Sequence, residues 1–116
     1  MKNTISINKK LEALCDIVTE SHTRIQQDFH NINPIVGVNQ AMREQGIPAD
    51  LVTIDCLKSG KRIILILQDE QPDTISYQFS FKDKDPDEKF ENIDFNELTA
   101  NKVYGWIKGY FSSAAN

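Results

Sequence analysis

The sequence lacks any long hydrophobic run. Its longest uninterrupted apolar stretch is "IILIL" at 63–67, whereas a helix that crosses a membrane needs about 20 apolar residues. No apolar segment follows the first lysine, so the N-terminal residues do not have the pattern of a secretory signal. From these two absences we expect a cytoplasmic protein that does not associate with membranes.

Cysteine is equally scarce. Cys15 and Cys56 are the only two, and their separation of 41 residues matches no metal-binding spacing. Without a secretion signal, two isolated cysteines are typical of buried thiols in a reducing compartment. The sequence therefore predicts reduced thiols and no cysteine metal site.

Positive charge is thinly spread. The formal net charge is −4, and residues 83–97 hold seven carboxylates against two lysines, so the rest of the chain is close to neutral. A general nucleic-acid binder needs a basic face that displaces counterions from phosphates. The densest cationic stretch, "KSGKR" at 58–62, has the pattern of a solvated turn between strands. The charge balance thus argues against nucleic acid as a partner. Nucleic-acid binding through 58–62 is a third hypothesis, after the two given at the end of this section.

Recognisable catalytic motifs are missing as well. Cys56 lies on the apolar face of a predicted strand and His22 on the apolar stripe of a predicted helix, where such side chains usually pack. The acidic pair Asp69 and Glu70 follows an apolar strand, but no glycine-rich phosphate loop precedes it. We assign no catalytic residue, no metal ligand and no cofactor, and we lean against an enzyme. A pair of carboxylates in a cleft is the form of catalysis that the sequence does not exclude.

The residues that are present suffice for one domain. The chain has 116 residues, of which 40% are apolar and 26% charged, the composition of an ordinary globular protein. No repeat, low-complexity tract or linker divides it. We predict a single α+β domain over 1–116, with an acidic loop at 82–94 before the C-terminal helix.

Apolar residues recur at three- and four-residue steps near the N-terminus, which is the period of an amphipathic helix. The stripe consists of Ile7, Leu11, Leu14, Val18, His22, Ile25, Phe29 and Ile32. It predicts a helix over about 9–31, roughly 34 Å long at 1.5 Å per residue. Because this is longer than a short sheet can cover, we expect one end to overhang or to meet a second copy of the chain.

Two kinds of signal follow this helix. Asn33 and Pro34 at the start and Gly46 at the end predict a short helix over 33–46. Alternating or continuous apolar residues then predict three strands, at 50–58, 62–68 and 74–81. Short turns between them leave no room for crossover connections, so we expect an antiparallel meander.

The last helix is predicted from Asp94 and Glu97, which have the spacing of a capping box. Its buried face is formed by Phe95, Val103, Trp106, Ile107 and Tyr110. The order α-(short α)-β-β-β-α predicts a two-layer α+β domain whose helices pack on one face of a three-stranded antiparallel meander. This order is similar to that of double-stranded RNA-binding domains and, with additions, of small secretion chaperones, an analogy of fold that assigns no function.

The acidic stretch "DKDPDEKFENID" at 83–94 resembles the ligand ladder of a calcium loop. Carboxylates fall at loop positions 1, 3, 5, 9 and 12. Position 6, however, is Glu88, where a calcium loop turns sharply on glycine, and position 12 is Asp94, one methylene shorter than the usual glutamate. We interpret the stretch as a solvated acidic loop that serves as a docking surface.

The remaining candidate site residues are apolar positions on the last helix. Tyr104 and Phe111 fall at the edges of its buried stripe, and Gly105 and Gly109 stand four residues apart on the other side, a spacing that can admit a second backbone. We predict partner binding through seven residues: Asp83, Asp85, Asp87, Glu88, Glu91, Tyr104 and Phe111.

From these features we expect a small protein-binding module, such as an adaptor, an inhibitor or a chaperone-like accessory protein. A partner, possibly basic and possibly a second copy, would meet the acidic surface together with a helix face or a sheet edge at 50–58 or 74–81. The alternative is an enzyme or small-ligand-binding protein with a pocket between helices and sheet.

Overall fold

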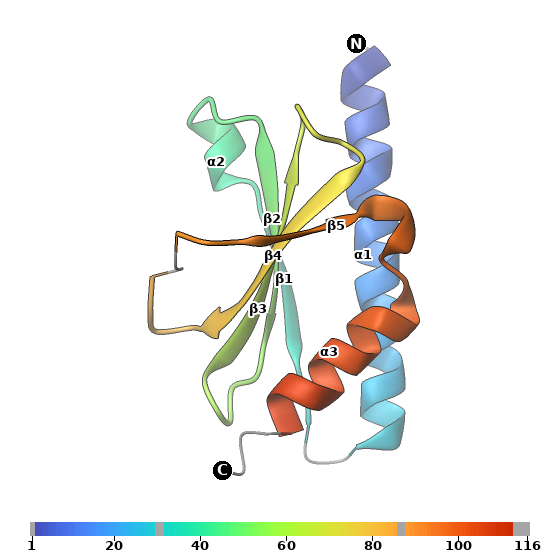
Figure 1. Ribbon diagram of the computed structural model, residues 1–116, viewed down its shortest axis with the longest axis vertical. Helices are drawn as coiled ribbons and strands as arrows, with labels where there is room; N and C mark the ends of the chain where they lie inside the picture. Colours follow the sequence, from blue (N-terminus) through green and yellow to red (C-terminus); the bar gives the residue numbers. More distant parts are fainter. Residues whose placement is uncertain (1, 30–31, 86–87, 113–116) are drawn as a thin grey trace.

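The computed structural model describes residues 2–29, 32–85 and 88–112, with side chains from residue 9 onward (Figure 1). Helices and strands follow one another in this order: α1 (Lys2–Asp28), β1 (Ile35–Asn39), α2 (Ala41–Glu44), β2 (Ala49–Asp55), β3 (Lys61–Gln68), β4 (Thr74–Phe81), β5 (Glu91–Asp94) and α3 (Ala100–Ser112). A 3₁₀ turn at Phe95–Glu97 joins β5 to α3. The α+β class is as predicted.

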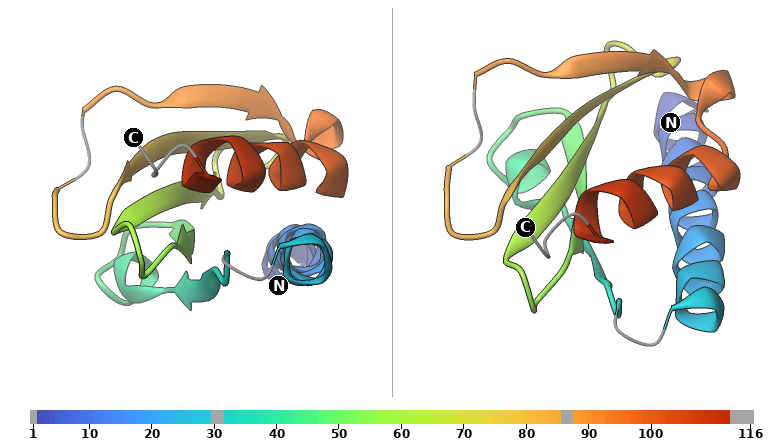
Figure 2. Two further views of the ribbon diagram at one scale, coloured as in Figure 1. Left: turned by 90° about the horizontal axis from the view of Figure 1, so that it is seen from below. Right: turned by 60° about the horizontal axis from the view of Figure 1, so that its bottom comes forward.

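The strands form one antiparallel sheet in the order β1-β2-β3-β4-β5. β2, β3 and β4 form the predicted meander of three strands. The sheet also contains β1 and β5, which were not predicted, so the predicted number of strands and the predicted order of elements are wrong. The long helices α1 and α3 cover one face of the sheet, while α2 lies at its other side (Figure 2). The prediction that the helices share one face therefore holds for α1 and α3 only.

Two segments differ from their predicted structures. Residues 33–46 contain β1 and the single turn α2, because the β-branched residues of "IVGVN" pair with β2 and outweigh the capping signals around them. Gly46, with φ of +89°, does end α2 as predicted. Residues 91–94 form β5, and α3 begins at Ala100, so Asp94 makes no side-chain capping hydrogen bond.

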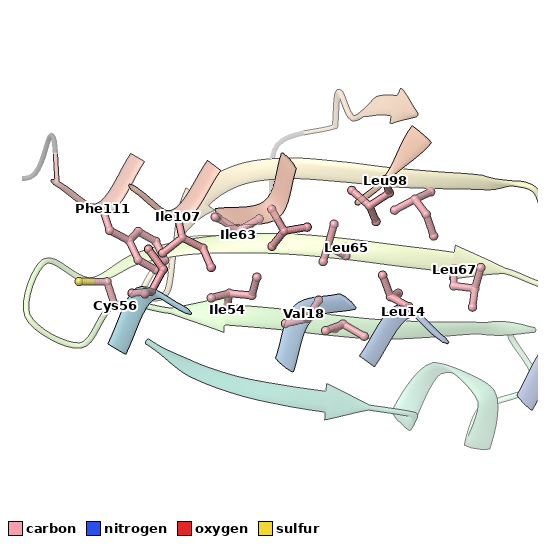
Figure 3. Packing of buried hydrophobic residues seen from close by; sticks show 14 of the residues in the cluster. Leu14, Val18, Ile54, Cys56, Ile63, Leu65, Leu67, Leu98, Ile107 and Phe111 are labelled. Carbon is pink, nitrogen blue, oxygen red and sulfur yellow. The ribbon is translucent and has the colours of Figure 1, made fainter. Parts of the chain in front are cut away.

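The core lies between the sheet and the two long helices (Figure 3). Alternate residues of β2 and β3, among them Val52, Ile54, Ile63 and Leu65, point toward the helices and are fully buried. The helices contribute side chains that are almost fully buried: Leu14, Val18, Ile25, Val103, Ile107 and Phe111.

Ser21 is a polar residue inside this core. It is fully buried, and its hydroxyl lies 2.9 Å from the carbonyl oxygens of Ile17 and Ala100. Arg24 contacts Asn101, and the Tyr104 hydroxyl donates a hydrogen bond to Asp28. Polar contacts therefore join the C-terminal part of α1 to the start of α3, two helices that lie near opposite ends of the sequence.

Candidate functional site

The outer edge of β4 is only half covered. β5 pairs with Thr74–Tyr77, so the second half of β4, residues 78–81, has no strand beside it within the described residues. The Lys82 amide donates to the Gly60 carbonyl on the β3 side. Because antiparallel strands alternate their hydrogen-bonding directions, the N–H and C=O of Phe79 point away from β3. This half of β4 thus exposes backbone groups that can pair with an added strand.

Aromatic rings line the helix-covered side of this edge. Tyr77 stacks on Trp106 with 4.4 Å between ring centroids, and Phe79 stacks on Tyr110 at 5.0 Å. Phe79 also meets Trp106 edge to face at 5.7 Å. We call Tyr77, Phe79, Trp106 and Tyr110 the aromatic cluster. Phe79 is 41% exposed despite these contacts, and its neighbour Phe81 is 40% exposed.

Tyr110 holds the cluster in place. Its hydroxyl donates a hydrogen bond of 2.7 Å to the Ser80 carbonyl, and burial raises the pKa of this phenol. The Lys61 ammonium donates to the Tyr110 carbonyl at 3.0 Å and lies 4.7 Å from the centre of the Tyr110 ring. The rings are therefore fixed by polar contacts as well as by stacking, and they form a rigid surface.

The predicted acidic residues lie on the other side of the same edge. Asp83, Asp85, Glu88 and Glu91 are all exposed, and Asp87 lies outside the described residues. Gln78 points to the face that α1 and α3 leave open, and its amide donates to the Lys89 carbonyl at 2.8 Å. The described residues of the segment between β4 and β5, 82–85 and 88–90, lie on the side of the sheet away from α1 and α3 (Figure 2).

Cations are interspersed with these carboxylates. Lys82 and Lys84 alternate with Asp83 and Asp85, and the Lys84 ammonium lies 5.4 Å from the centre of the Phe81 ring. The negative charge of the segment is therefore a net excess, not a continuous acidic patch, and Phe81 already accepts a cation on its face.

The two aromatic site residues predicted on α3 lie elsewhere. Tyr104 donates a hydrogen bond to Asp28 on α1, which raises the pKa of the phenol, and the Arg24 guanidinium lies 4.6 Å from its ring centre. Phe111 is 3% exposed in the core and offers almost no surface to a partner. A Cβ added at Gly105 or Gly109 would meet nothing within 4 Å. The structure thus brings the acidic residues together but separates Tyr104 and Phe111 from them.

The cationic stretch at 58–62 is largely engaged by protein groups. Arg62 forms two hydrogen bonds to the Asp55 carboxylate, at 2.6 and 2.9 Å, which raise the pKa of the guanidinium. Lys61 contacts Tyr110 as described above. Lys58 belongs to the turn between β2 and β3. These contacts direct two of the three cations toward the protein and away from a phosphate backbone.

A second candidate site lies beside α2. Arg43 donates to both oxygens of Asp50, which is 1% exposed, and to both oxygens of Asp69. These bonds raise the pKa of Arg43 and hold the pKa of Asp69 below its usual range. α2 is thereby fixed over the open face of the sheet, where a pocket of about 270 Å³ is lined by Met42, Ile47, Pro48, Ala49, Ile66, Gln68 and Glu70.

Within the part of the chain that the structure describes, no three His, Cys, Asp or Glu side chains converge on a point where a metal ion could bind. In the same residues, no helix is both long and apolar enough to cross a membrane. We found no match to the chain among protein-family profiles, curated proteins or solved structures.

The exposed residues Phe79 and Phe81 were not predicted as site residues. The alternation of apolar and polar residues at 74–81 predicts one buried face for the whole strand. A strand pattern does not show where the covering helix ends, and α3 leaves the last apolar positions of β4 partly open. The two phenylalanines near the end of this strand are the sequence feature that could have indicated a binding site, because aromatic residues are enriched at binding surfaces.

Proposed function

We propose that this protein binds an extended segment of another protein along residues 78–81 of β4. The observation that carries the proposal is the pair of rings at Phe79 and Phe81, each about two-fifths exposed, beside the half of β4 that pairs with no strand on its outer side within the described residues. Monomeric proteins seldom leave large aromatic side chains exposed next to open backbone groups, since such edges invite pairing. An added strand would bury the rings and satisfy the backbone of Phe79 in one step.

The two faces of the sheet at this edge favour a partner strand in which apolar and basic residues alternate. A partner residue paired with Phe79 would point to the helix-covered face, because opposite residues of an antiparallel pair share a face. There it would contact Phe79 and Trp106, which favours an apolar side chain. Its neighbours along the partner strand would point to the opposite face, toward the side of Asp83, Asp85 and Glu88, which favours lysine or arginine.

Charge and stacking contribute differently to this binding. The acidic excess of residues 82–97 attracts a basic segment over distance and speeds its approach, an effect that salt screens within about 10 Å at 0.1 M. Ring burial and backbone pairing act after contact and determine how slowly the complex dissociates. Charge variants should therefore change the association rate, and ring variants the dissociation rate.

Selection from a displayed library of random 12-residue peptides tests the proposal. We expect enrichment of peptides that alternate basic with apolar residues, and a change in the fluorescence of Trp106, the single tryptophan, when such a peptide is added. The double variant Phe79→Ser and Phe81→Ser should lose the selected peptides. Leu57→Ser is the matched control, because Leu57 is 59% exposed but lies in the β2–β3 turn. Equal binding by the double variant and the control would disprove the proposal.

A small-ligand site beside α2 is the second candidate. The pocket of about 270 Å³ lies just below the range typical of ligand sites, roughly 300–1,000 Å³, and its lining is apolar except for Gln68 and Glu70. A short alkyl amine matches this chemistry, with its chain on Ile47 and Ile66 and its ammonium near Glu70. Hexylamine should raise the melting temperature of the wild type but not of Ile47→Asp. An equal shift in both proteins would rule out this site.

A further inference from the structure

The opposite edge of the sheet, β1, is unprotected. Its sequence "IVGVN" contains no charged residue and no proline, the two devices by which proteins usually prevent edge strands from pairing. Ile35 and Val38 are 48% and 49% exposed. By contrast, β5 at the other edge carries the charged residues Glu91 and Asp94. β1 therefore lacks, along its whole length, the charged residues that protect β5 from strand addition.

The hydrogen-bond pattern shows which groups β1 presents. The Cys56 amide donates to the Lys61 carbonyl, so the even-numbered residues of β2 point their backbone groups to β3 and the odd-numbered residues point theirs to β1. All five residues of β1 lie opposite residues of β2, and the backbone groups of residues 35, 37 and 39 are the ones that point toward β2. The N–H and C=O groups of Val36 and Val38 project from the outer edge of the sheet, ready to pair with another strand.

This edge is self-complementary. If two copies of β1 run antiparallel about a twofold axis at Gly37, Val36 of each copy faces Val38 of the other, and each such pair exchanges both backbone hydrogen bonds. The paired valine side chains share the face that α1 covers, so an exposed apolar side chain meets another apolar side chain. Gly37 faces its own counterpart across the axis, where no side chain obstructs the approach.

The flank of α1 beside β1 is uncharged from Cys15 to Gln26, and Glu12 follows at its N-terminal end. His22 contacts the Pro34 carbonyl at 2.6 Å, and the Gln26 amide donates to Asn33 at 3.0 Å, which fixes this flank next to the start of β1. Thr19 and Cys15 continue the same flank at helical spacing. Across the sheet, Asp55, the neighbour of Ile35 on β2, is paired with Arg62. A protein of net charge −4 can therefore meet a second copy here without contact between like charges.

From these observations we infer that β1 is the docking surface for a second copy of this chain, which joins two five-stranded sheets into one continuous sheet. A stable dimer buries about 800 Å² per subunit. Five paired residues supply part of that area, so the α1 flank must supply the rest, and we expect a dimer that dissociates at micromolar concentrations. The edge of β4 lies at the far side of each sheet, so both copies keep it accessible.

Sedimentation velocity over a range of concentrations tests the inference. The wild type should shift from 13.2 kDa toward twice that mass as its concentration rises. Val38→Lys, which places a charge in the middle of the edge, should remain at 13.2 kDa. Leu57→Lys is the matched control and should dimerise as the wild type does, since it adds the same charge at a site 59% exposed in the β2–β3 turn. A wild type that stays monomeric at every concentration overturns the inference.

A cross-link keeps the test valid should Val38→Lys fail to fold. With Cys15 and Cys56 replaced by alanine, Gly37→Cys puts one thiol on each side of the axis. The Cα atoms of such a non-hydrogen-bonded pair lie about 4.5 Å apart, within disulfide range. A Cβ at position 37 meets the Thr53 hydroxyl at 3.3 Å, a small group that can rotate aside. Oxidation should yield a covalent dimer from Gly37→Cys but not from Leu57→Cys. Equal yields would show that the contact is random.

Discussion

Replacement of Arg43 by methionine would leave the Asp50 carboxylate, 1% exposed, without the guanidinium that donates to both of its oxygens. Removal of one partner of a buried ion pair destabilises a protein by about 3–5 kcal/mol, because the remaining charge stays buried. Gln40 still donates to one Asp50 oxygen at 3.2 Å, and the Arg43 side chain is 35% exposed. We therefore expect the lower end of that range, about 3 kcal/mol.

A second substitution identifies the source of this loss. In the wild type, Asp50→Asn weakens the bonds to Arg43 and should destabilise the protein by about 1–2 kcal/mol. In the Arg43→Met background the same change removes an unpaired buried charge, so it should stabilise the protein by about 1–3 kcal/mol. Asp50→Asn should thus lower the free energy of unfolding when residue 43 is arginine and raise it when residue 43 is methionine. This reversal is expected only if the Asp50 carboxylate is buried and charged.

Urea unfolding followed by Trp106 fluorescence measures these differences as shifts of the midpoint at constant slope. For a domain of this size, 3 kcal/mol also corresponds to a fall in melting temperature of roughly 10 °C. Lys10→Met is the control: its partner Asp73 is 89% exposed, so the change should cost less than about 1 kcal/mol. Equal destabilisation of both backgrounds by Asp50→Asn would show that Arg43 does not compensate a buried charge at Asp50.

Three further outcomes follow from the contacts described above. Ser21→Ala should lower the free energy of unfolding by about 1 kcal/mol, the contribution of one hydrogen bond. Ser21→Leu should lower it by more, because the space around Ser21 is already filled by other side chains. A leucine variant that is more stable than the wild type in urea unfolding would contradict this. Asp69, whose pKa is lowered by Arg43, stabilises the fold above pH of about 4 and loses this contribution as the pH falls through its folded pKa. The stability gap between the wild type and Asp69→Asn should accordingly narrow between pH 7 and pH 3, and a constant gap would show that the carboxylate is not coupled to Arg43. Millimolar calcium should leave the melting temperature unchanged, since a bound ion would raise it by mass action; a rise of several degrees that chelation reverses would establish a calcium site.

The sequence predicted the parts of the fold that depend on local periodicity. The patterns at 50–58, 62–68 and 74–81 predicted three strands, which the structure confirms within a few residues. The apolar stripe predicted a helix over about 9–31, and α1 is confirmed as a helix but begins earlier, at Lys2, and ends at Asp28. These segments are long, and their side chains alternate with the period of their own structure. The buried Ser21 departs from this pattern, because its hydroxyl is satisfied by a carbonyl of α3, a contact that no local pattern reveals.

The two missed strands depend on pairing with distant residues. β1 carries β-branched residues that favour a strand, but Pro34 and Gly46 also fit the ends of a helix, and pairing with β2 decides between the two. β5 has four residues and one apolar side chain, so its conformation is set by β4 alone. The exposed carboxylates of the candidate site were predictable from composition. The exposure of Phe79 and Phe81 was not, because it depends on where β5 and α3 end.

The contacts between α1 and α3 also determine how this protein can be made. The apolar face of the sheet needs both helices as cover, and α3 is the last described element of the chain. During synthesis, Leu14, Val18 and the apolar side chains of β2 and β3 therefore stay partly open to water until residues 100–112 have left the ribosome. A hydrophobic surface that stays uncovered until α3 has been synthesised is one that chaperones bind and that can cause aggregation. Truncation before α3 should thus leave this apolar surface uncovered and make the shortened chain more prone to aggregation than the full chain.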